Sequence, residues 1–485
     1  MREVPGRFFL WEGRDALEGA PALAGPDCLL TYGEVCRRML GIADALRTAG
    51  IGRGDRIAVL GPNSVECVLL LIALWRLGAV AVPVSTRWPP GLVDMALEGI
   101  GCRTLVLSRD HAGEYGKAYR VFLLDEVVAP CRLDQGTPEA LSHPVDCDQD
   151  ATIIYTSGSS GTPKAVLHTL GNHCHSALGS NALIPFAPGD RWLLSLPLYH
   201  IAGIAILFRA ALGGGAVAVP GTTAPIDECI RQEGVTHCSL VSTQLYRLLQ
   251  KRETREALSR MKAILLGGGA FPDRLIEKAL EYGLPIHLSY GSTEMASQIT
   301  TAGCGGHGSA LQCSGAPLPF REVKIAPDGE ILVRGQTLFK GYVQGAAVTR
   351  GCDREGWFHT GDTGLLDEKG DLTVTGRRDR MFISGGENIQ PEEIERHLCR
   401  LPGVLQAVVV PVRDEEFGER PVAFVEMGEG ASFEPRVLAR RLEPHLPRFK
   451  IPDQFLPWPD AVSLCGEKPN RMLLRKLAEE SLSPG

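Results

Sequence analysis

Short runs of β-branched and aliphatic residues alternate with helical stretches through the first half of the chain. The runs that resemble buried strands are RIAVLG (56–61), AVAVPV (79–84), TLVLS (104–108), AVAVP (216–220) and AILLGGG (263–269). The stretch between the first two runs has the spacing of a helix. Strands that alternate with helices in this way are typical of layered α/β structure with largely parallel sheets.

The longest apolar stretch, CVLLLIALWRLGAVAVPV (67–84), is nearly long enough to cross a lipid bilayer. Arg76 and Gly78 divide it into a helical first half and an alternating second half that ends at Pro83. This division favours a buried helix, a turn and a strand, and we expect no membrane insertion.

The pattern changes after about residue 310. EVKIAPDGEILVRG (322–335) and GLLDEKGDLTVTGRRD (364–379) each place a Gly-containing turn between two strand-like runs. Such turns predict antiparallel hairpins. A β-rich subdomain therefore follows the α/β layers.

A compact mixed unit is predicted beyond residue 380. Its expected elements are a helix (391–398), two strands (404–412 and 421–427) and a second helix (433–446). The fold class is thus α/β, with a large N-terminal domain at residues 1–378 and a small hinged α+β lid at residues 379–485.

Composition narrows the class of protein. The chain has 485 residues, 44% of them hydrophobic, and a formal net charge of −7, so several cores are expected and no general attraction to nucleic acid. The 14 cysteines lack the spacing of a disulfide framework, and the N-terminus does not resemble a secretory signal. We therefore expect free thiols and a cytoplasmic location. HCHS (173–176) has no second Cys/His pair at zinc-finger spacing, so a metal site is not predicted there.

The sequence IIYTSGSSGTPK (153–164) places a hydroxyl-rich, Gly-containing loop directly after an apolar strand. Backbone N–H groups exposed at glycines can surround phosphate oxygens, and a lysine adds a mobile positive charge. The predicted phosphate-binding residues are Thr156, Ser157, Gly158, Ser159, Ser160, Gly161, Thr162 and Lys164. The spacing is not that of a Walker A motif, which disfavours a P-loop kinase, and a solvated linker is the alternative.

Arg209 is the one charge in the apolar run YHIAGIAILFRAALGGGAVAVP (199–220). A guanidinium in such surroundings needs an anion, because desolvating an unpaired charge is costly. The anion could be a protein carboxylate or a substrate carboxylate.

Five motifs together resemble the adenylate-forming superfamily of acyl-CoA synthetases, luciferases and peptide-synthetase adenylation domains. They are YTSGSSGTPKAVLHT (155–169), SYGSTEMAS (289–297), FHTGDTG (358–364), GRRDRMFISGGENIQPEEIE (376–395) and GEKPNRMLLRKL (466–477), in the family's order. The resemblance implies a two-step reaction. A carboxylate attacks the α-phosphate of ATP to give an acyl adenylate and pyrophosphate, and coenzyme A then displaces AMP. ATP, Mg²⁺ and coenzyme A are thus the implied cofactors.

The same resemblance implies roles for residues that bind the nucleotide. Glu294 would hold Mg²⁺ and Thr293 would contact phosphate, while Asp362 would accept the ribose hydroxyls and Arg377 would contact the ribose. The residues expected to line the adenine are Gly268, Gly269, Ala270, Tyr290 and Gly291.

The lid also carries implied roles. Lys468 would supply the positive charge for adenylation, Asp379 would be the hinge, and Gly385 and Gly386 would let the pantetheine arm pass. The lysine motif departs from the usual pattern at Glu467 and Pro469. Lys476 and Lys450 are the alternatives for the adenylation lysine.

Within the superfamily, RWLLSLPLYHIAGIAILFR (191–209) and SLVSTQLYRLL (239–249) resemble the o-succinylbenzoate–CoA ligases of menaquinone biosynthesis. Their substrate has an aromatic ring carboxylate and a succinyl carboxylate. By resemblance, Arg209 would pair with the ring carboxylate, directly or through water, and His200 would lie near the reactive end. The other implied pocket contacts are Ser242, Thr243, Gly268 and Ser292.

Two alternatives stay open at this point, and a third is disfavoured. A sister enzyme would ligate another aryl or fatty acid, and a non-catalytic homologue would only bind the nucleotide. A peptide-synthetase loading domain would normally adjoin a carrier domain, for which the chain leaves no room. A homodimer is expected only by analogy with relatives.

Overall fold

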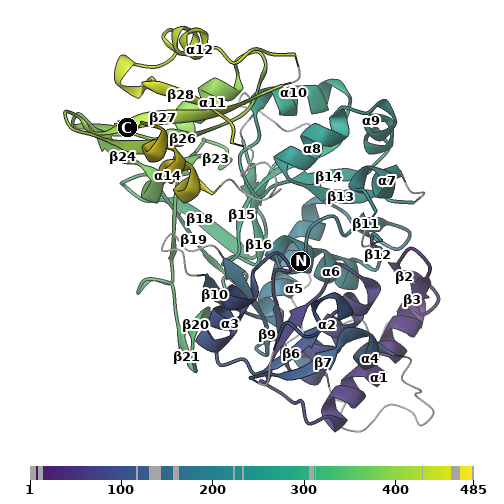
Figure 1. Cartoon of the computed structure of the whole chain (residues 1–485). Coiled ribbons are helices and arrows are strands. Elements are labelled where there is room, and N and C mark those ends of the chain that lie inside the picture. The colour runs from purple at the N-terminus through teal and green to yellow at the C-terminus, as the bar shows by residue number, and fades with distance from the viewer. Residues whose placement is uncertain are drawn as a thin grey trace.

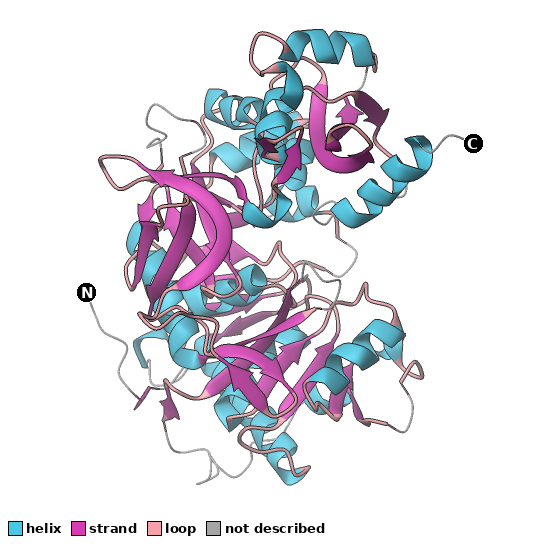
Figure 2. Ribbon diagram, turned by 90° about the vertical axis from the view of Figure 1, so that its left-hand side faces the viewer, coloured by secondary structure: helices cyan, strands magenta, loops and turns pink. Residues whose placement is uncertain are grey.

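The structure is a computed structural model that describes residues 7–8, 15–115, 118–129, 144–156, 163–221, 224–231, 234–304, 311, 313–428, 430–459 and 470–482. Sheets and helices of the N-terminal part form the larger body in Figure 1, and the C-terminal elements gather above it. Figure 2 shows the same division from the side.

The first large sheet carries the predicted phosphate loop. In spatial order its strands are β21 (Ala347–Thr349), β20 (Gly341–Gln344), β10 (Lys164–Thr169), β9 (Asp150–Thr156), β5 (Val80–Pro83), β4 (Arg56–Leu60), β6 (Thr104–Leu107) and β7 (Arg120–Leu123). Strands β9, β5, β4, β6 and β7 are parallel, whereas β10, β20 and β21 continue the sheet antiparallel. Thr156 and Lys164 face each other in the β9–β10 register, on either side of the loop.

The second large sheet carries the predicted adenine and acyl residues. In spatial order its strands are β17 (Ala316–Pro317), β16 (Ser297–Thr301), β15 (Ile286–Ser292), β14 (Ala263–Leu266), β13 (His237–Leu240), β11 (Arg191–Leu193), β12 (Ala216–Ala218), β2 (Pro21–Ala24) and β3 (Leu29–Thr31). The strands from β15 to β2 are parallel, and antiparallel pairs close both ends. A small pair, β1 (Arg7–Phe8) with β8 (Val145–Asp146), lies outside both sheets.

Four helices lie between the two large sheets and share one apolar core with them. They are α1 (Tyr32–Thr48), α2 (Val65–Leu77), α5 (Leu170–Leu183) and α6 (Ile201–Gly213). The Thr31 and Thr169 hydroxyls cap α1 and α5, and Ser64 caps α2, so each of these helices begins where a side chain satisfies its first N–H groups.

The outer faces are covered by shorter helices. They are α3 (Pro90–Gly99), α7 (Ile226–Arg231), α8 (Ser242–Leu249), α9 (Arg252–Ser259) and α10 (Asp273–Glu281), whereas the short α4 (Leu124–Val128) packs against α1 and α2 in the shared core. Helices α7 to α10 pack on the second sheet, and α3 packs on the first.

The apolar stretch at 67–84 folds as the sequence predicts. Helix α2 ends at Gly78, whose φ of 85° suits a left-handed cap, and β5 follows. In the described part of the chain, no helix is long and apolar enough to cross a membrane.

The predicted hairpins form a third, antiparallel sheet. Its strands are β18 (Arg321–Ile325), β19 (Glu330–Gly335), β22 (Phe358–Leu366) and β23 (Leu372–Arg377). The single-turn helix η4 (Arg378–Arg380) leads from β23 into the C-terminal unit, which we call the lid. The predicted boundary at residues 378 and 379 falls on η4 and stays a prediction.

The lid is a sheet with helices on both faces. It comprises β24 (Phe382–Ser384), β25 (Glu387–Ile389), β26 (Val404–Asp414), β27 (Gly418–Met427), β28 (Gln454–Pro457), α11 (Pro391–Cys399), α12 (Pro435–Leu442) and α14 (Arg471–Leu482). Helices α11 and α12 cover one core and α14 covers the other. The second predicted helix is shorter than expected, because Pro444 cannot donate a helical hydrogen bond. The β24–β25 hairpin was not predicted.

The cysteines and the HCHS segment (173–176) bear on the expected thiol and metal chemistry. The cysteines of the described ranges form no disulfide with one another. The residues of HCHS lie in α5, where His173 and Cys174 are buried, and the described residues contain no cluster suited to a metal ion.

Candidate active site

The predicted ribose-binding residues meet at the junction of three strands. Asp362 of β22 and Arg377 of β23 face each other in the sheet register, and their side chains form an ion pair of 3.2 Å. The Tyr290 hydroxyl, from β15, donates to the other Asp362 oxygen at 2.7 Å. Arg377 Nε also donates to the predicted hinge residue Asp379 at 2.9 Å. A carboxylate that could accept ribose hydroxyls is thus held by residues from the second and third sheets.

Burial and charge act together on this cluster. Burial, and then the nearby Asp362 charge, raise the pKa of Tyr290 well above its usual value, so its hydroxyl remains a donor. Burial alone would lower the pKa of Arg377, but Asp379 and Asp362 raise it overall. The guanidinium therefore stays positive beside the carboxylate at all physiological pH values.

Glu294 lies beside the end of the phosphate loop. Tyr342 of β20 donates its hydroxyl to one Glu294 oxygen at 2.8 Å. Lys164, at the start of β10, lies 5.4 Å above the centre of the Tyr342 ring. One Glu294 oxygen accepts no hydrogen bond from the described residues, and an ionised carboxylate is a ligand that Mg²⁺ prefers. The residues present therefore fit the magnesium ion that the family resemblance implies.

The turn that carries Thr293 and Glu294 joins β15 to β16. Its last two residues, Ala296 and Ser297, have φ values of 52° and 107°, which are unusual for residues other than glycine. At its start, Gly291 leaves no room for a side chain, because a Cβ would lie 2.1 Å from the Ser297 carbonyl oxygen. The backbone on the two sides of this turn is therefore in close contact at Gly291.

The predicted adenine loop follows β14. Gly268 has a φ of 84°, which favours glycine, and a Cβ on it would contact Val241 at 3.4 Å. Ser242 and Thr243 follow Val241 in the chain and begin α8. The loop with Gly269 and Ala270 thus lies beside two of the predicted acyl-pocket residues.

Arg209 is buried in α6, with 1% of its surface exposed. Its Nη2 donates to Gln298 Oε1 at 2.7 Å, and its guanidinium lies 4.8 Å from the Trp192 ring centre. Its Nε has no hydrogen-bond partner, and among the described residues no carboxylate lies within ion-pair distance. Burial lowers the pKa of Arg209 to about 9, so it remains a cation at neutral pH.

A polar chain leads from Arg209 toward the adenine region. Gln298 Nε2 donates to Thr301 Oγ1 at 2.7 Å, and Thr301 Oγ1 donates to Ser289 Oγ at 3.2 Å. Ser289 precedes Tyr290 in β15. The buried arginine is thus connected to the strand that carries the ribose-side tyrosine.

His200 lies at the N-terminus of α6, where its ring contacts that of Tyr199. Asn63 holds the preceding loop by donating to two carbonyls and accepting from the Leu198 N–H. Gly203 allows a close approach, since a Cβ there would lie 2.3 Å from the Pro197 oxygen. Ser292, the remaining predicted pocket residue, accepts a hydrogen bond from the Met295 N–H.

Several predicted residues belong to the lid or lie outside the described residues. Gly385 and Gly386 form the turn between β24 and β25, and the Gly385 N–H donates to the Phe417 carbonyl at 2.9 Å. Lys450 pairs with Glu393 and Lys476 with Glu480, so both alternatives to Lys468 already have a carboxylate partner. Lys468 itself and the loop residues Ser157, Gly158, Ser159, Ser160, Gly161 and Thr162 lie outside the described residues.

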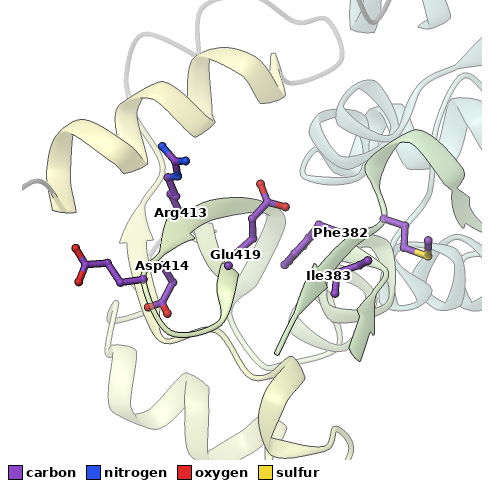
Figure 3. Close-up of a pocket in the computed structure, with 8 residues that line it drawn as sticks. Phe382, Ile383, Arg413, Asp414 and Glu419 are labelled. Atoms are coloured by element: carbon purple, nitrogen blue, oxygen red, sulfur yellow. The ribbon is translucent and has the colours of Figure 1, made fainter. Parts of the chain in front are cut away.

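An open hollow of about 780 Å³ lies on the lid sheet, between β24 and the β26–β27 hairpin. Figure 3 shows Phe382 and Ile383 on one side and Arg413, Asp414 and Glu419 on the other. Glu419 is paired with Arg475 of α14. The hollow borders the predicted pantetheine glycines but shares no lining residue with the nucleotide cluster.

Two known protein families match the sequence of this chain. Residues 11–343 match the AMP-binding enzyme family, and residues 393–463 match the AMP-binding enzyme C-terminal domain. The chain belongs to the AMP-binding enzyme family. This confirms the predicted adenylate-forming superfamily.

Relatives within the AMP-binding enzymes narrow the similarity. The chain is 35% identical to the 2-succinylbenzoate–CoA ligase of Salmonella typhimurium over 464 residues, which cover 96% of both chains. It is also 35% identical to the ligase of the same name from Escherichia coli, over 94% of both chains.

Solved structures agree with the sequence relatives. An arginine-to-lysine variant of E. coli MenE with bound OSB-AMS matches with a TM-score of 0.86 and 32% identity, over 99% of this chain and 100% of that one. Bacillus subtilis o-succinylbenzoate CoA synthetase with the intermediate OSB-AMP matches with a TM-score of 0.82 and 30% identity, over 97% and 96%. The same enzyme with ATP and a magnesium ion matches with a TM-score of 0.80 and 32% identity, over 90% and 93%.

Two functional candidates were missed from the sequence of this AMP-binding enzyme. Tyr342 and Gln298 each hold a predicted site residue, Glu294 and Arg209 respectively. Neither stands in a recognisable motif for that role, and only the pairing of β10 with β20 brings Tyr342 toward the site. No sequence signal indicated either one.

Proposed function

We propose that this chain is an ATP-dependent 2-succinylbenzoate–CoA ligase that forms an acyl adenylate and then a thioester, in menaquinone biosynthesis. The predicted activity agrees with ligases of that name at 35% identity over nearly the whole chain. It also agrees with the adenylate OSB-AMP, and with ATP and magnesium, in the solved relatives. The observation within this chain that supports it most strongly is the buried Arg209, with which no carboxylate of the described residues pairs.

In the first step, two anions must approach each other. Lys164 and Lys468 would supply positive charge near the phosphates, and Glu294 would hold the magnesium ion that neutralises them. Asp362 would fix the ribose, and the Tyr290 and Arg377 contacts keep that carboxylate in one orientation. The residues thus orient the α-phosphate toward the attacking carboxylate, which lowers the barrier mainly through positioning and charge.

Recognition of the acid would come from Arg209. Its Nε has no partner in the described part of the chain, and Gln298 is a neutral neighbour, so a ring carboxylate that reaches the guanidinium would complete its hydrogen bonds. The succinyl carboxylate is then left for adenylation. His200, Ser242, Thr243, Gly268 and Ser292 would line the rest of the acyl pocket.

Three further proposals follow from the family resemblance. The chain would act in the cytoplasm and as a homodimer, and its lid would turn about Asp379, so that Gly385 and Gly386 meet the pantetheine arm in the second step. Sedimentation equilibrium tests the dimer, and limited proteolysis near residues 376–380 tests the domain boundary at 378 and 379.

The activity is tested by ATP-dependent pyrophosphate release in the presence of coenzyme A. The acids to compare are 2-succinylbenzoate, benzoate and a medium-chain fatty acid. We expect release with 2-succinylbenzoate alone. Release with the other acids would assign a different substrate, and no release with any acid would favour a nucleotide-binding homologue without catalysis.

A further inference from the structure

The turn at residues 292–297 is held by side chains from outside it. His168 of β10 donates from Nε2 to the Thr293 carbonyl at 2.7 Å, and Ser176 of α5 donates to the Ala296 carbonyl at 2.6 Å. Both side chains are buried, with 0% and 3% of their surfaces exposed. They therefore contact the turn from the protein interior, on the side away from solvent.

Burial of the His168 side chain in this position costs free energy of folding. Because Nε2 donates to a carbonyl, Nδ1 is the unprotonated nitrogen, and it is buried without a hydrogen-bond partner among the residues that the structure describes. An apolar side chain of similar size would avoid this unsatisfied atom. The hydrogen bond to Thr293 is the feature that an apolar residue could not supply.

A neighbouring histidine provides an internal comparison. His173 of α5 is also buried, its Nδ1 likewise has no partner within the described ranges, and its ring centre lies 5.0 Å from that of His168. Its Nε2, however, pairs with the Thr152 hydroxyl of β9 at 2.5 Å. The two residues therefore share burial and ring contact, but His168 alone of the pair bonds the turn.

The strained backbone explains why such a bond matters. Ala296 and Ser297 adopt positive φ, a conformation that persists only where the surroundings determine it. Thr293 also accepts a hydrogen bond from the Ala296 N–H at 3.0 Å, so its carbonyl ties both ends of the turn. Loss of the interior contact would let the turn relax and move Thr293 and Glu294 together.

We propose that His168 is a positioning residue that, with Ser176, fixes the 292–297 turn and so directs Thr293 and Glu294 toward Mg²⁺ and the phosphates of ATP. This inference rests on the proposed function only in that Glu294 serves the magnesium ion. It requires no particular acid substrate.

The test measures binding of ATP by isothermal titration calorimetry, with Mg²⁺ and with EDTA, in the absence of any acid. We compare His168→Phe, His168→Gln, which keeps a donor near Nε2, and the matched control His173→Phe. For His168→Phe we expect the Kd of Mg²⁺–ATP to rise about tenfold, as for loss of one hydrogen bond. The Kd in EDTA should rise less than the Kd of Mg²⁺–ATP does, because only the Thr293 contact with phosphate is then lost. His168→Gln should recover most of the loss, and His173→Phe should bind as the unaltered protein does.

Two results would overturn the proposal. One is an unchanged Mg²⁺–ATP affinity in folded His168→Phe, and the other is an equal loss in His173→Phe. If His168→Phe does not fold, Ser176→Ala carries the test at the other end of the turn, with the same expected rise and the same contradicting result. Because no acid is present, failure of the proposed substrate would leave these outcomes unaffected.

Discussion

The proposed nucleotide side and the proposed acyl side of the site differ in whether their charged side chains have partners within the protein. On the nucleotide side, Asp362 is paired with Arg377 and Tyr290, and Glu294 accepts from Tyr342. On the acyl side, Arg209 contacts a neutral amide and an aromatic ring, its charge acts on a second buried guanidinium, Arg321, and in the described residues no carboxylate pairs with Arg209.

The difference shows where the protein supplies the partner of a charged group and where the ligand would supply it. Partners within the chain hold Asp362 and Glu294 in position before ATP arrives, so little reorganisation is needed on binding. A buried guanidinium without an anion is destabilising by itself, and a ligand carboxylate would remove that cost. On the proposed function, the acyl side would gain its selectivity from an interaction that only the correct acid completes.

The largest effect on the reaction rate is expected at Lys468, which the lid would contribute to the nucleotide side. Lys468→Ala should lower the rate of adenylation by about 10²–10³-fold, as for loss of one group that stabilises developing charge. Thioester formation from preformed adenylate should change much less. Rapid-quench measurement of the two half-reactions checks this, and equal losses in both would remove Lys468 from the role.

The next effect separates the two sides directly. Arg209→Met should lower kcat/KM for 2-succinylbenzoate by about 30-fold or more, the cost of leaving a buried carboxylate without its partner. The KM for ATP should stay within twofold, because the nucleotide contacts are intact. Steady-state kinetics with each substrate varied gives both values, and Arg209→Lys keeps the charge as a control.

The counterpart of the Arg209 substitution on the nucleotide side is a substitution of Asp362. Asp362→Asn should raise the KM for ATP about tenfold, since a neutral amide accepts weaker hydrogen bonds from the ribose than a carboxylate does. It should leave the KM for 2-succinylbenzoate nearly unchanged. If both constants rise together, the two sides are not independent and the comparison fails.

A smaller effect is expected at Gln298, which orients Arg209. Gln298→Leu removes the Nη2 acceptor and should raise the KM for 2-succinylbenzoate about three- to tenfold, as for one hydrogen bond. Gln298→Glu should weaken the acid further, because a carboxylate in that position would compete with the substrate for the guanidinium. Binding of the acid that improved in Gln298→Glu would contradict this account.

The sequence was most informative where structure is local. The hairpin strands β18 and β19, and β22 and β23, were recognisable from Gly-containing turns, and the helix–turn–strand at 67–84 from Gly78 and Pro83. The motifs also placed Asp362, Arg377 and Tyr290, which the structure brings together.

What the sequence left out depends on distant contacts. Gln298 lies 89 residues from Arg209, and Tyr342 lies 48 residues from Glu294. Neither pairing follows from a local pattern, because each is set by which strands become neighbours. The burial of Arg209 could be predicted from its apolar run, but whether a protein carboxylate would reach it required the fold.

The central claim is that Arg209 recognises the ring carboxylate of the substrate. The most direct measurement is a double cycle of kcat/KM for pyrophosphate release, with 2-succinylbenzoate and 4-oxo-4-phenylbutanoate, which lacks that carboxylate, in the unaltered protein and in Arg209→Met. We expect the unaltered protein to prefer 2-succinylbenzoate about 30-fold or more and the variant to lose most of this preference. The same preference in both proteins would contradict it.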